Sequence, residues 1–175
     1  MARRGRRYFS KMVWAASDPG KLGGLQAMVA PLVIERVCQG DLDIPEAGEP
    51  HRTVVENALA KARHAAELSG LPALADDAGL CVDAFGGLPG VDTAFYATQF
   101  GYAKGDDNNV RALLEQMHGM DNRPAAMVST LVAVRSADDP APLIAVGRAI
   151  GEIPRQPPAA IAFAPTLLSV FAQIV

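Results

Sequence analysis

Blocks of hydrophobic residues separated by polar and glycine-rich stretches divide the first part of this chain into short elements. Apolar runs at residues 11–16 and 32–37 are typical of buried β-strands, and a Ser-Asp-Pro-Gly turn follows the first of them. Residues 21–30 between these runs form a weaker helix candidate, because two adjacent glycines interrupt the pattern. The loop expected at residues 38–52 is rich in Asp, Gly, Glu and Pro.

Two later segments have the spacing of amphipathic helices. In residues 53–69, Thr53 and Glu56 form a capping box, and apolar residues then recur every three to four positions up to a Gly-Leu-Pro stop. A similar pattern covers residues 107–117. Both segments are therefore predicted to be helices.

The remaining apolar runs predict strands. A short strand at residues 71–75 is expected to end at the turn 76–79, and residues 86–90 (GGLPG) predict a tight loop. Two longer strands, 126–135 and 143–150, flank a Ser-Ala-Asp-Asp-Pro turn. Strands and helices that alternate first and end in a strand pair favour an α/β domain with a mixed sheet.

Composition narrows the class of protein. The chain has 175 residues, half of them hydrophobic, with 16 basic and 19 acidic residues and a net charge of −3. One domain with a sizeable core is expected. Residues 1–11 are a basic leader without acids, so the rest of the chain is acidic, which argues against binding of nucleic acid.

Cysteine content and hydropathy bear on location. Cys38 and Cys81 have no spacing typical of a zinc site or a disulfide framework, so a reducing, cytoplasmic compartment is expected. The apolar run after the basic leader is too short for an export signal. The chargeless residues 156–175 are interrupted by prolines, and a membrane anchor is therefore not expected.

Two adjacent carboxylates are the most informative local feature. Asp76 and Asp77 close an apolar run, and Gly79 would allow the chain to turn there. A carboxylate at the end of a strand is well placed to bind a metal ion or act as a general base. An Asp pair that caps a turn fits the same residues, and the sequence leaves both interpretations open.

Weaker signals accompany this pair. Asn57, Lys61 and His64 share one stripe of the helix at residues 53–69, which could face a phosphate or be the solvated side. Lys21 follows a Pro-Gly turn that could hold an anion. Glu49 is either a metal ligand or a surface acid.

Four blocks in the same order carry a resemblance to a known family. These are residues 17–21 (SDPGK), 53–63 (TVVENALAKAR), 71–80 (LPALADDAGL) and 86–90 (GGLPG). Together they resemble the inosine triphosphate pyrophosphatases, also termed XTP/dITP diphosphatases. The resemblance covers residues 12–155, and residues 156–175 form an atypical apolar tail that reads like a truncated or frame-shifted end.

The resemblance implies a two-lobed α/β fold with a long mixed sheet flanked by helices and a nucleotide cleft between the lobes. It implies Mg²⁺-dependent hydrolysis of ITP, dITP or XTP to a monophosphate and pyrophosphate, by a homodimer. It assigns the general base and a metal ligand to Asp77, further metal ligation to Asp76 and Glu49, and substrate binding to Ser17, Asp18, Lys21, Asn57, Lys61 and Ala78.

Several residues depart from the family pattern. Asp18 stands where Asn is usual, Gly24 where Glu is usual, Ala78 where Ser is usual, and Phe95 where Arg is frequent. The family's Gly-Phe-Gly-Tyr-Asp-Pro segment and its later His-Arg pair are absent after residue 155. A non-catalytic nucleotide-binding paralogue is therefore the alternative function.

Overall fold

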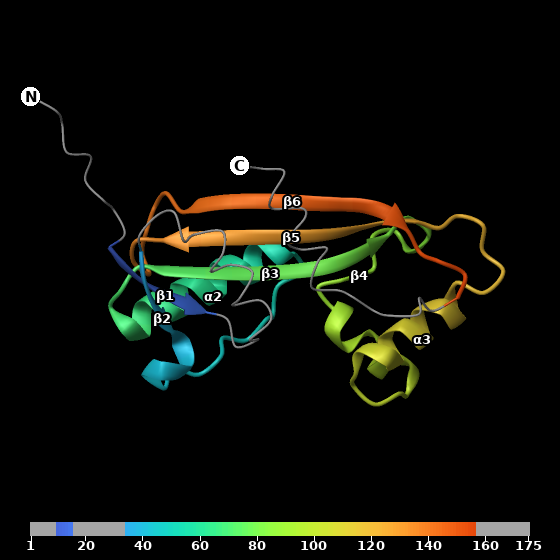
Figure 1. Ribbon diagram of the computed structural model, residues 1–175, viewed down its shortest axis with the longest axis horizontal. Coiled ribbons are helices and arrows are strands. Elements are labelled where there is room, and N and C mark those ends of the chain that lie inside the picture. Colours follow the sequence, from blue (N-terminus) through green and yellow to red (C-terminus); the bar gives the residue numbers. More distant parts are fainter. Residues whose placement is uncertain (1–9, 16–33, 157–175) are drawn as a thin grey trace, which may run out of the picture. The chain divides into compact units, whose positions relative to one another are not determined.

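The computed structural model describes residues 10–15 and 34–156 (Figure 1). The expectations for residues 17–21, for the helix at 21–30 and for the tail after residue 156 lie outside this part of the chain. Two compact units make up the fold. Of the described residues, unit 1 comprises those up to Pro50 together with Val55–Asp76 and Leu131–Ala145, and unit 2 comprises the others.

In unit 1, parallel strands pair beside one long helix. Strand β1 (Lys11–Ala15) pairs in parallel with β2 (Glu35–Cys38) and with the first residues of β3 (Ala73–Val82). Helix α2 (Val54–Ser69) begins directly after Thr53, as the capping box predicts. These elements confirm the predicted first strand and the predicted long helix.

Small side chains let α2 pack closely on the strands. Ala58, Ala62, Ala65 and Ala66 recur on one face of the helix and are buried. They pack against apolar side chains of the strands, which are Val13, Ala15, Ala73, Ala75, Val132 and Val134. Because side chains alternate along a strand, Met12, Trp14 and Leu74 form a second cluster on the opposite face.

Unit 2 has its own core. Helix α3 (Asp106–Gln116) confirms the helix predicted at residues 107–117. It packs beside the 3-10 segment η4 (Thr93–Phe100), and the sequence pattern did not predict η4. Their shared core consists of Val82, Tyr96, Ala97, Ala112, Leu113, Met117 and Ala125.

Long strands complete the sheet. Strands β5 (Pro124–Val134) and β6 (Leu143–Glu152) follow the two predicted runs closely. In the described part of the chain the order is β2-β1-β3-β5-β6, with β4 (Pro89–Gly90) paired antiparallel to β3. The arrows of β5 and β6 run in opposite directions (Figure 1), so the predicted mixed sheet is confirmed.

Three local predictions need correction. The predicted turn at residues 76–79 is wrong, because β3 continues through it to Val82. The expected loop at 38–52 contains a 3-10 segment, η2 (Gln39–Leu42). In the predicted tight loop at 86–90, Gly86 and Gly87 make the turn, and its last two residues form β4.

Candidate functional site

Asp76 and Asp77 lie inside a continuous strand. Their relative exposures are 8% and 7%, so both carboxyl groups are buried. Successive side chains of β3 point to opposite sides, and Asp77 therefore points to the side of Ala73 and Ala75, while Asp76 points to the side of Leu74. The interpretation as a turn-capping pair is wrong. Burying two carboxylates is costly unless partners compensate them, and such positions are enriched at functional sites.

Gly79 does not form a turn, and its missing side chain instead lets β3 and β4 approach each other closely. A methyl group added at Gly79 would lie 2.2 Å from the carbonyl oxygen of Gly90 in β4. Thr93 joins the two strands, because its hydroxyl accepts from the Leu80 N–H at 2.7 Å and donates to the Gly90 carbonyl at 2.6 Å. This contact holds β3 against β4 just after the two aspartates.

On α2, the polar stripe is not the solvated face. Asn57 is fully buried, and the Lys61 side chain is only 16% exposed. His64, one turn further along, is half-buried. A buried amide and a mostly buried lysine on one helix face favour the interpretation of this stripe as functional.

Glu49 reaches the same helix from the loop that precedes it. Its carboxylate forms an ion pair with the Lys61 ammonium group, and the Glu49 side chain is 40% exposed. The structure thus brings together two residues that the sequence assigned to metal and phosphate binding. An acid and a lysine that pair in this way neutralise one another until a ligand with its own charges displaces the contact.

The acidic residues predicted to bind metal do not by themselves form a complete metal site. Among the residues that the model describes, no group of three or more His, Cys, Asp or Glu side chains is arranged to hold a metal ion. Ala78 follows Asp77 in β3 and carries no hydroxyl. Ser17, Asp18 and Lys21 lie outside the described residues.

Two side chains support the Glu49 loop, and the sequence indicated only one of them. Gln39 Nε2 and His64 Nε2 both contact the Pro45 carbonyl oxygen, at 3.1 and 3.0 Å. His64 belongs to the polar stripe and carried that signal, whereas nothing in the sequence marked Gln39.

Phe95, which stands where the resembling family often has an arginine, lies next to a lysine. The Lys104 ammonium group lies over the Phe95 ring, 4.2 Å from its centre. A positive charge therefore remains at this place in unit 2 although the arginine is absent.

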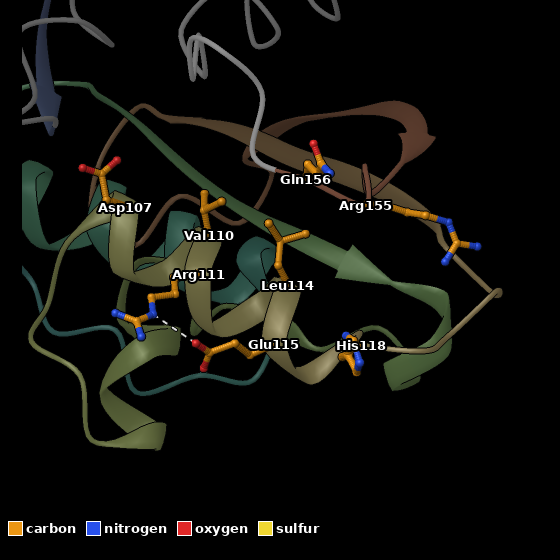
Figure 2. A pocket seen from close by; sticks show the side chains of 8 residues that line it. All are labelled: Asp107, Val110, Arg111, Leu114, Glu115, His118, Arg155 and Gln156. Atoms are coloured by element: carbon orange, nitrogen blue, oxygen red, sulfur yellow. Dashed lines mark hydrogen bonds and ion pairs between the residues drawn. The ribbon is translucent and has the colours of Figure 1, made fainter.

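A pocket of about 790 Å³ opens on α3 (Figure 2). Val110 and Leu114 supply apolar surface, and charged side chains surround them. Hydrogen bonds from Tyr102 and Arg111 to Glu115, at 2.6 and 3.0 Å, lower the pKa of this carboxyl group. The pocket contains none of the residues that the sequence assigned to chemistry.

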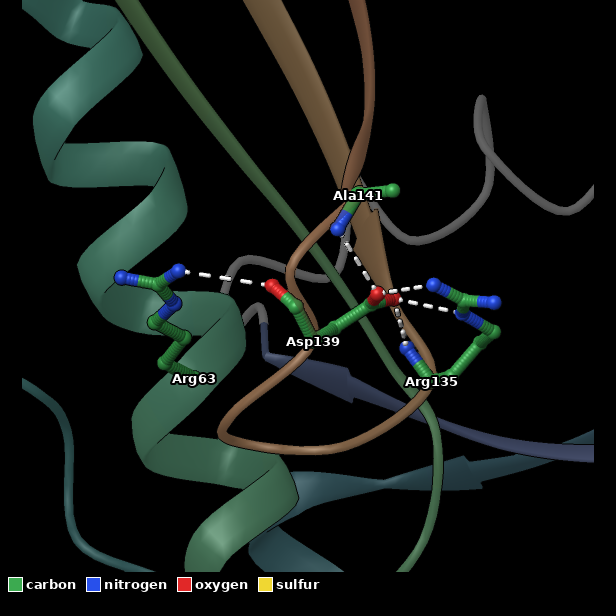
Figure 3. Close-up of polar contacts among 4 residues, drawn as sticks. All are labelled: Arg63, Arg135, Asp139 and Ala141. Atoms are coloured by element: carbon green, nitrogen blue, oxygen red, sulfur yellow. Dashed lines mark hydrogen bonds and ion pairs between the residues drawn. The ribbon is translucent and has the colours of Figure 1, made fainter.

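Asp139 is a buried acid with a structural role (Figure 3). Its carboxylate accepts from the Arg135 side chain, from the Arg135 N–H at 2.9 Å and from the Ala141 N–H at 3.0 Å. These hydrogen bonds hold the pKa of Asp139 well below its usual range, and the bond from the Arg135 guanidinium makes the largest contribution. The Asp139 carbonyl accepts from Arg63 of α2 at 3.5 Å, so the network joins the β5–β6 turn to the helix.

Similarity to known proteins shows the family of this chain. The model of the Ham1 family matches residues 12–164. The chain belongs to the Ham1 family. It is 74% identical over 147 residues to a protein of Albidiferax ferrireducens named dITP/XTP pyrophosphatase, covering 84% of this chain and 74% of that relative. A relative of the same name from Polaromonas naphthalenivorans is 66% identical over 174 residues, covering 94% and 86%.

Solved structures of Ham1 proteins share the fold. A HAM1 protein from Coxiella burnetii matches with a TM-score of 0.78 and 37% identity, over 85% of this chain and 75% of that one. A nucleoside-triphosphatase, dITP/XTP pyrophosphatase, from Mycobacterium abscessus matches with a TM-score of 0.70 and 32% identity, over 88% and 79%. The resemblance to this family and the α/β fold that it implied are confirmed. Within the described residues, no helix has the length and apolarity needed to cross a membrane.

Proposed function

We propose that this chain hydrolyses the non-standard purine nucleoside triphosphates ITP, dITP and XTP to a monophosphate and pyrophosphate, with Mg²⁺. The observation that carries the proposal is the 74% identity over 147 residues to a relative named dITP/XTP pyrophosphatase. The buried pair Asp76–Asp77 and the lysine–acid pair on α2 support it, since they are the residue types that phosphoanhydride hydrolysis requires.

Asp77 is proposed as the general base. Water attacks a phosphorus atom slowly unless a carboxylate orients it and takes up its proton. Asp77 suits this role because it is buried in a strand that Gly79 and Thr93 hold against β4, so its position is fixed before substrate binds. Asp76 is proposed as a further metal residue on the strength of the motif match alone, because its side chain lies on the opposite face of β3.

Lys61 and Asn57 are proposed to bind the triphosphate. In the free protein the Lys61 ammonium group pairs with Glu49. A triphosphate brings several negative charges and draws Lys61 to its oxygens, which leaves the Glu49 carboxylate available as a ligand. Ser17 and Lys21 are proposed as further substrate contacts on the strength of the motif match. Asp18 and Ala78 are proposed as contacts because they occupy the motif positions where the family usually has Asn and Ser.

The available donors fit magnesium. Mg²⁺ prefers oxygen ligands and is usually held by one or two carboxylates together with substrate phosphates and water. On the strength of the motif match, Asp77 and Glu49 are proposed to supply those carboxylates. When bound, the ion offsets the negative charge that the phosphates carry through the reaction.

A homodimer in the cytoplasm completes the proposal. The dimer rests on the resemblance, and the compartment rests on Cys38 and Cys81, which are both free thiols. Light scattering of the purified protein would measure the mass of the assembly directly.

Phosphate release from ITP tests the function. The parent protein with Mg²⁺ should yield orthophosphate only when inorganic pyrophosphatase is added, and Asp77→Asn should lower turnover roughly 10²- to 10⁴-fold while ITP still binds. Orthophosphate without the added enzyme would refute the proposal. Binding of ITP by the parent without any turnover would instead favour the non-catalytic paralogue.

A further inference from the structure

The loop that carries Glu49 has little regular structure of its own. After η2, residues 43–50 form no helix or strand, and most of them are exposed. Only Ile44 among them is buried, at 9% relative exposure. Apolar packing of Ile44 therefore fixes the start of this loop, whereas the later residues, which include Glu49, have no buried apolar side chain to hold them.

Polar contacts hold the loop at a second point, the carbonyl oxygen of Pro45. This oxygen accepts from Gln39 Nε2 at 3.1 Å and from His64 Nε2 at 3.0 Å. A carbonyl oxygen can only accept, so this contact is a hydrogen bond in the forms of His64 that carry a proton on Nε2. Gln39 is itself buried, at 5% relative exposure, and its backbone carbonyl accepts from the Ile44 N–H at 3.3 Å.

Helix α2 thus holds the same loop twice. His64 and Lys61 lie one turn apart, and neighbours at that spacing share a helix face. His64 holds Pro45, and Lys61 holds Glu49, four residues further along the loop. The Lys61 contact is the one that a triphosphate would take over, whereas the His64 contact involves no group that binds substrate.

We propose that His64, assisted by Gln39, is a positioning residue that keeps the Glu49 carboxylate in place for metal binding after Lys61 turns to the phosphates. This inference rests on the proposed function and adds the residue that supports its metal site. A ligand whose supporting hydrogen bond is lost must be ordered again at each binding event, and such losses typically weaken metal affinity about 10- to 100-fold.

Three variants distinguish a role of His64 in positioning Glu49 from a general effect on the stability of the protein. His64→Leu removes the donor and keeps an apolar side chain, whereas His64→Gln retains an N–H donor that can reach the Pro45 carbonyl. His118→Leu is the matched control, because His118 is an exposed histidine of unit 2 outside the proposed machinery.

The first measurement is hydrogen exchange in the protein without metal or nucleotide. We expect His64→Leu to speed exchange of the Asp43 and Ile44 amides, which donate to the Gly40 and Gln39 carbonyls, by about 10-fold or more, with His64→Gln and His118→Leu like the parent. Equal exchange in His64→Leu and the parent would overturn the proposal, whether or not the protein hydrolyses ITP.

The second measurement is the Mg²⁺ concentration for half-maximal hydrolysis of saturating ITP. We expect about a 10-fold rise for His64→Leu, with turnover at saturating Mg²⁺ within about twofold of the parent, and restoration in His64→Gln. Faster loop exchange with an unchanged Mg²⁺ requirement would overturn the positioning role. A parent protein that hydrolyses no ITP would refute the proposed function instead, and the exchange result would still decide whether His64 holds the loop.

Discussion

Gly79→Ala should destabilise unit 2 although it adds only one methyl group. The new carbon would lie 2.2 Å from the Gly90 carbonyl oxygen and 2.6 Å from its carbonyl carbon, whereas ordinary contacts exceed 3.4 Å. Strand β4 would have to retreat by about 1 Å, at an overpacking cost of roughly 1–3 kcal/mol. The retreat would also strain the two hydrogen bonds of Thr93, each contributing about 1 kcal/mol.

These terms predict a loss of about 3 kcal/mol, which lowers the unfolding temperature of a domain of this size by roughly 6–12 °C. Thermal unfolding followed by far-ultraviolet circular dichroism measures it. Gly151→Ala is the matched control, because a methyl group at Gly151 in β6 meets nothing within 4 Å. If both variants unfolded at the parental temperature, the close approach of β3 and β4 would be refuted.

Two further substitutions test separate parts of the account. Lys61→Ala should raise the KM for ITP roughly 10- to 100-fold with a smaller change in kcat, because a charged contact to the phosphates is lost; an unchanged KM in steady-state kinetics would exclude Lys61 from substrate binding. Asp139→Asn should lower the urea midpoint at pH 7 and differ less from the parent at pH 3. The lowered pKa of Asp139 contributes stability above its unfolded pKa of about 3.9, and this contribution is lost as pH falls toward the folded value. If the difference in urea midpoint between Asp139→Asn and the parent were the same at pH 7 and pH 3, the stabilising role of the Asp139 carboxylate would be refuted.

Elements with strong periodicity were predictable from the sequence. The helix after Thr53 and the strands β5 and β6 follow their apolar patterns to within a few residues, because local propensity and burial agree there. The pattern around Asp76 misled, since small and polar residues before Gly79 are typical of a turn. Pairing with β4 at Leu80 and Cys81 is a tertiary contact that keeps the chain extended, and no local signal encodes it.

The candidate site was predictable only in part. Motif blocks identified Asp77 and Lys61 as candidates, and the family resemblance added Glu49. The pairing of Glu49 with Lys61 depends on how residues 43–50 fold back on α2. Gln39 could not be found, because a lone glutamine in a loop resembles any surface residue until its amide is seen to donate to Pro45. Helical spacing placed His64 on the same stripe of the helix as Lys61 without indicating its partner.

Hydrolysis of ITP in oxygen-18 water tests the central claim most directly. Because the proposed base directs water to the α-phosphorus atom, phosphorus NMR should show the label in inosine monophosphate and none in the pyrophosphate released. The same label should be almost absent when Asp77→Asn is incubated for the same time. Label in pyrophosphate or orthophosphate would show attack at another phosphorus atom and would contradict the account.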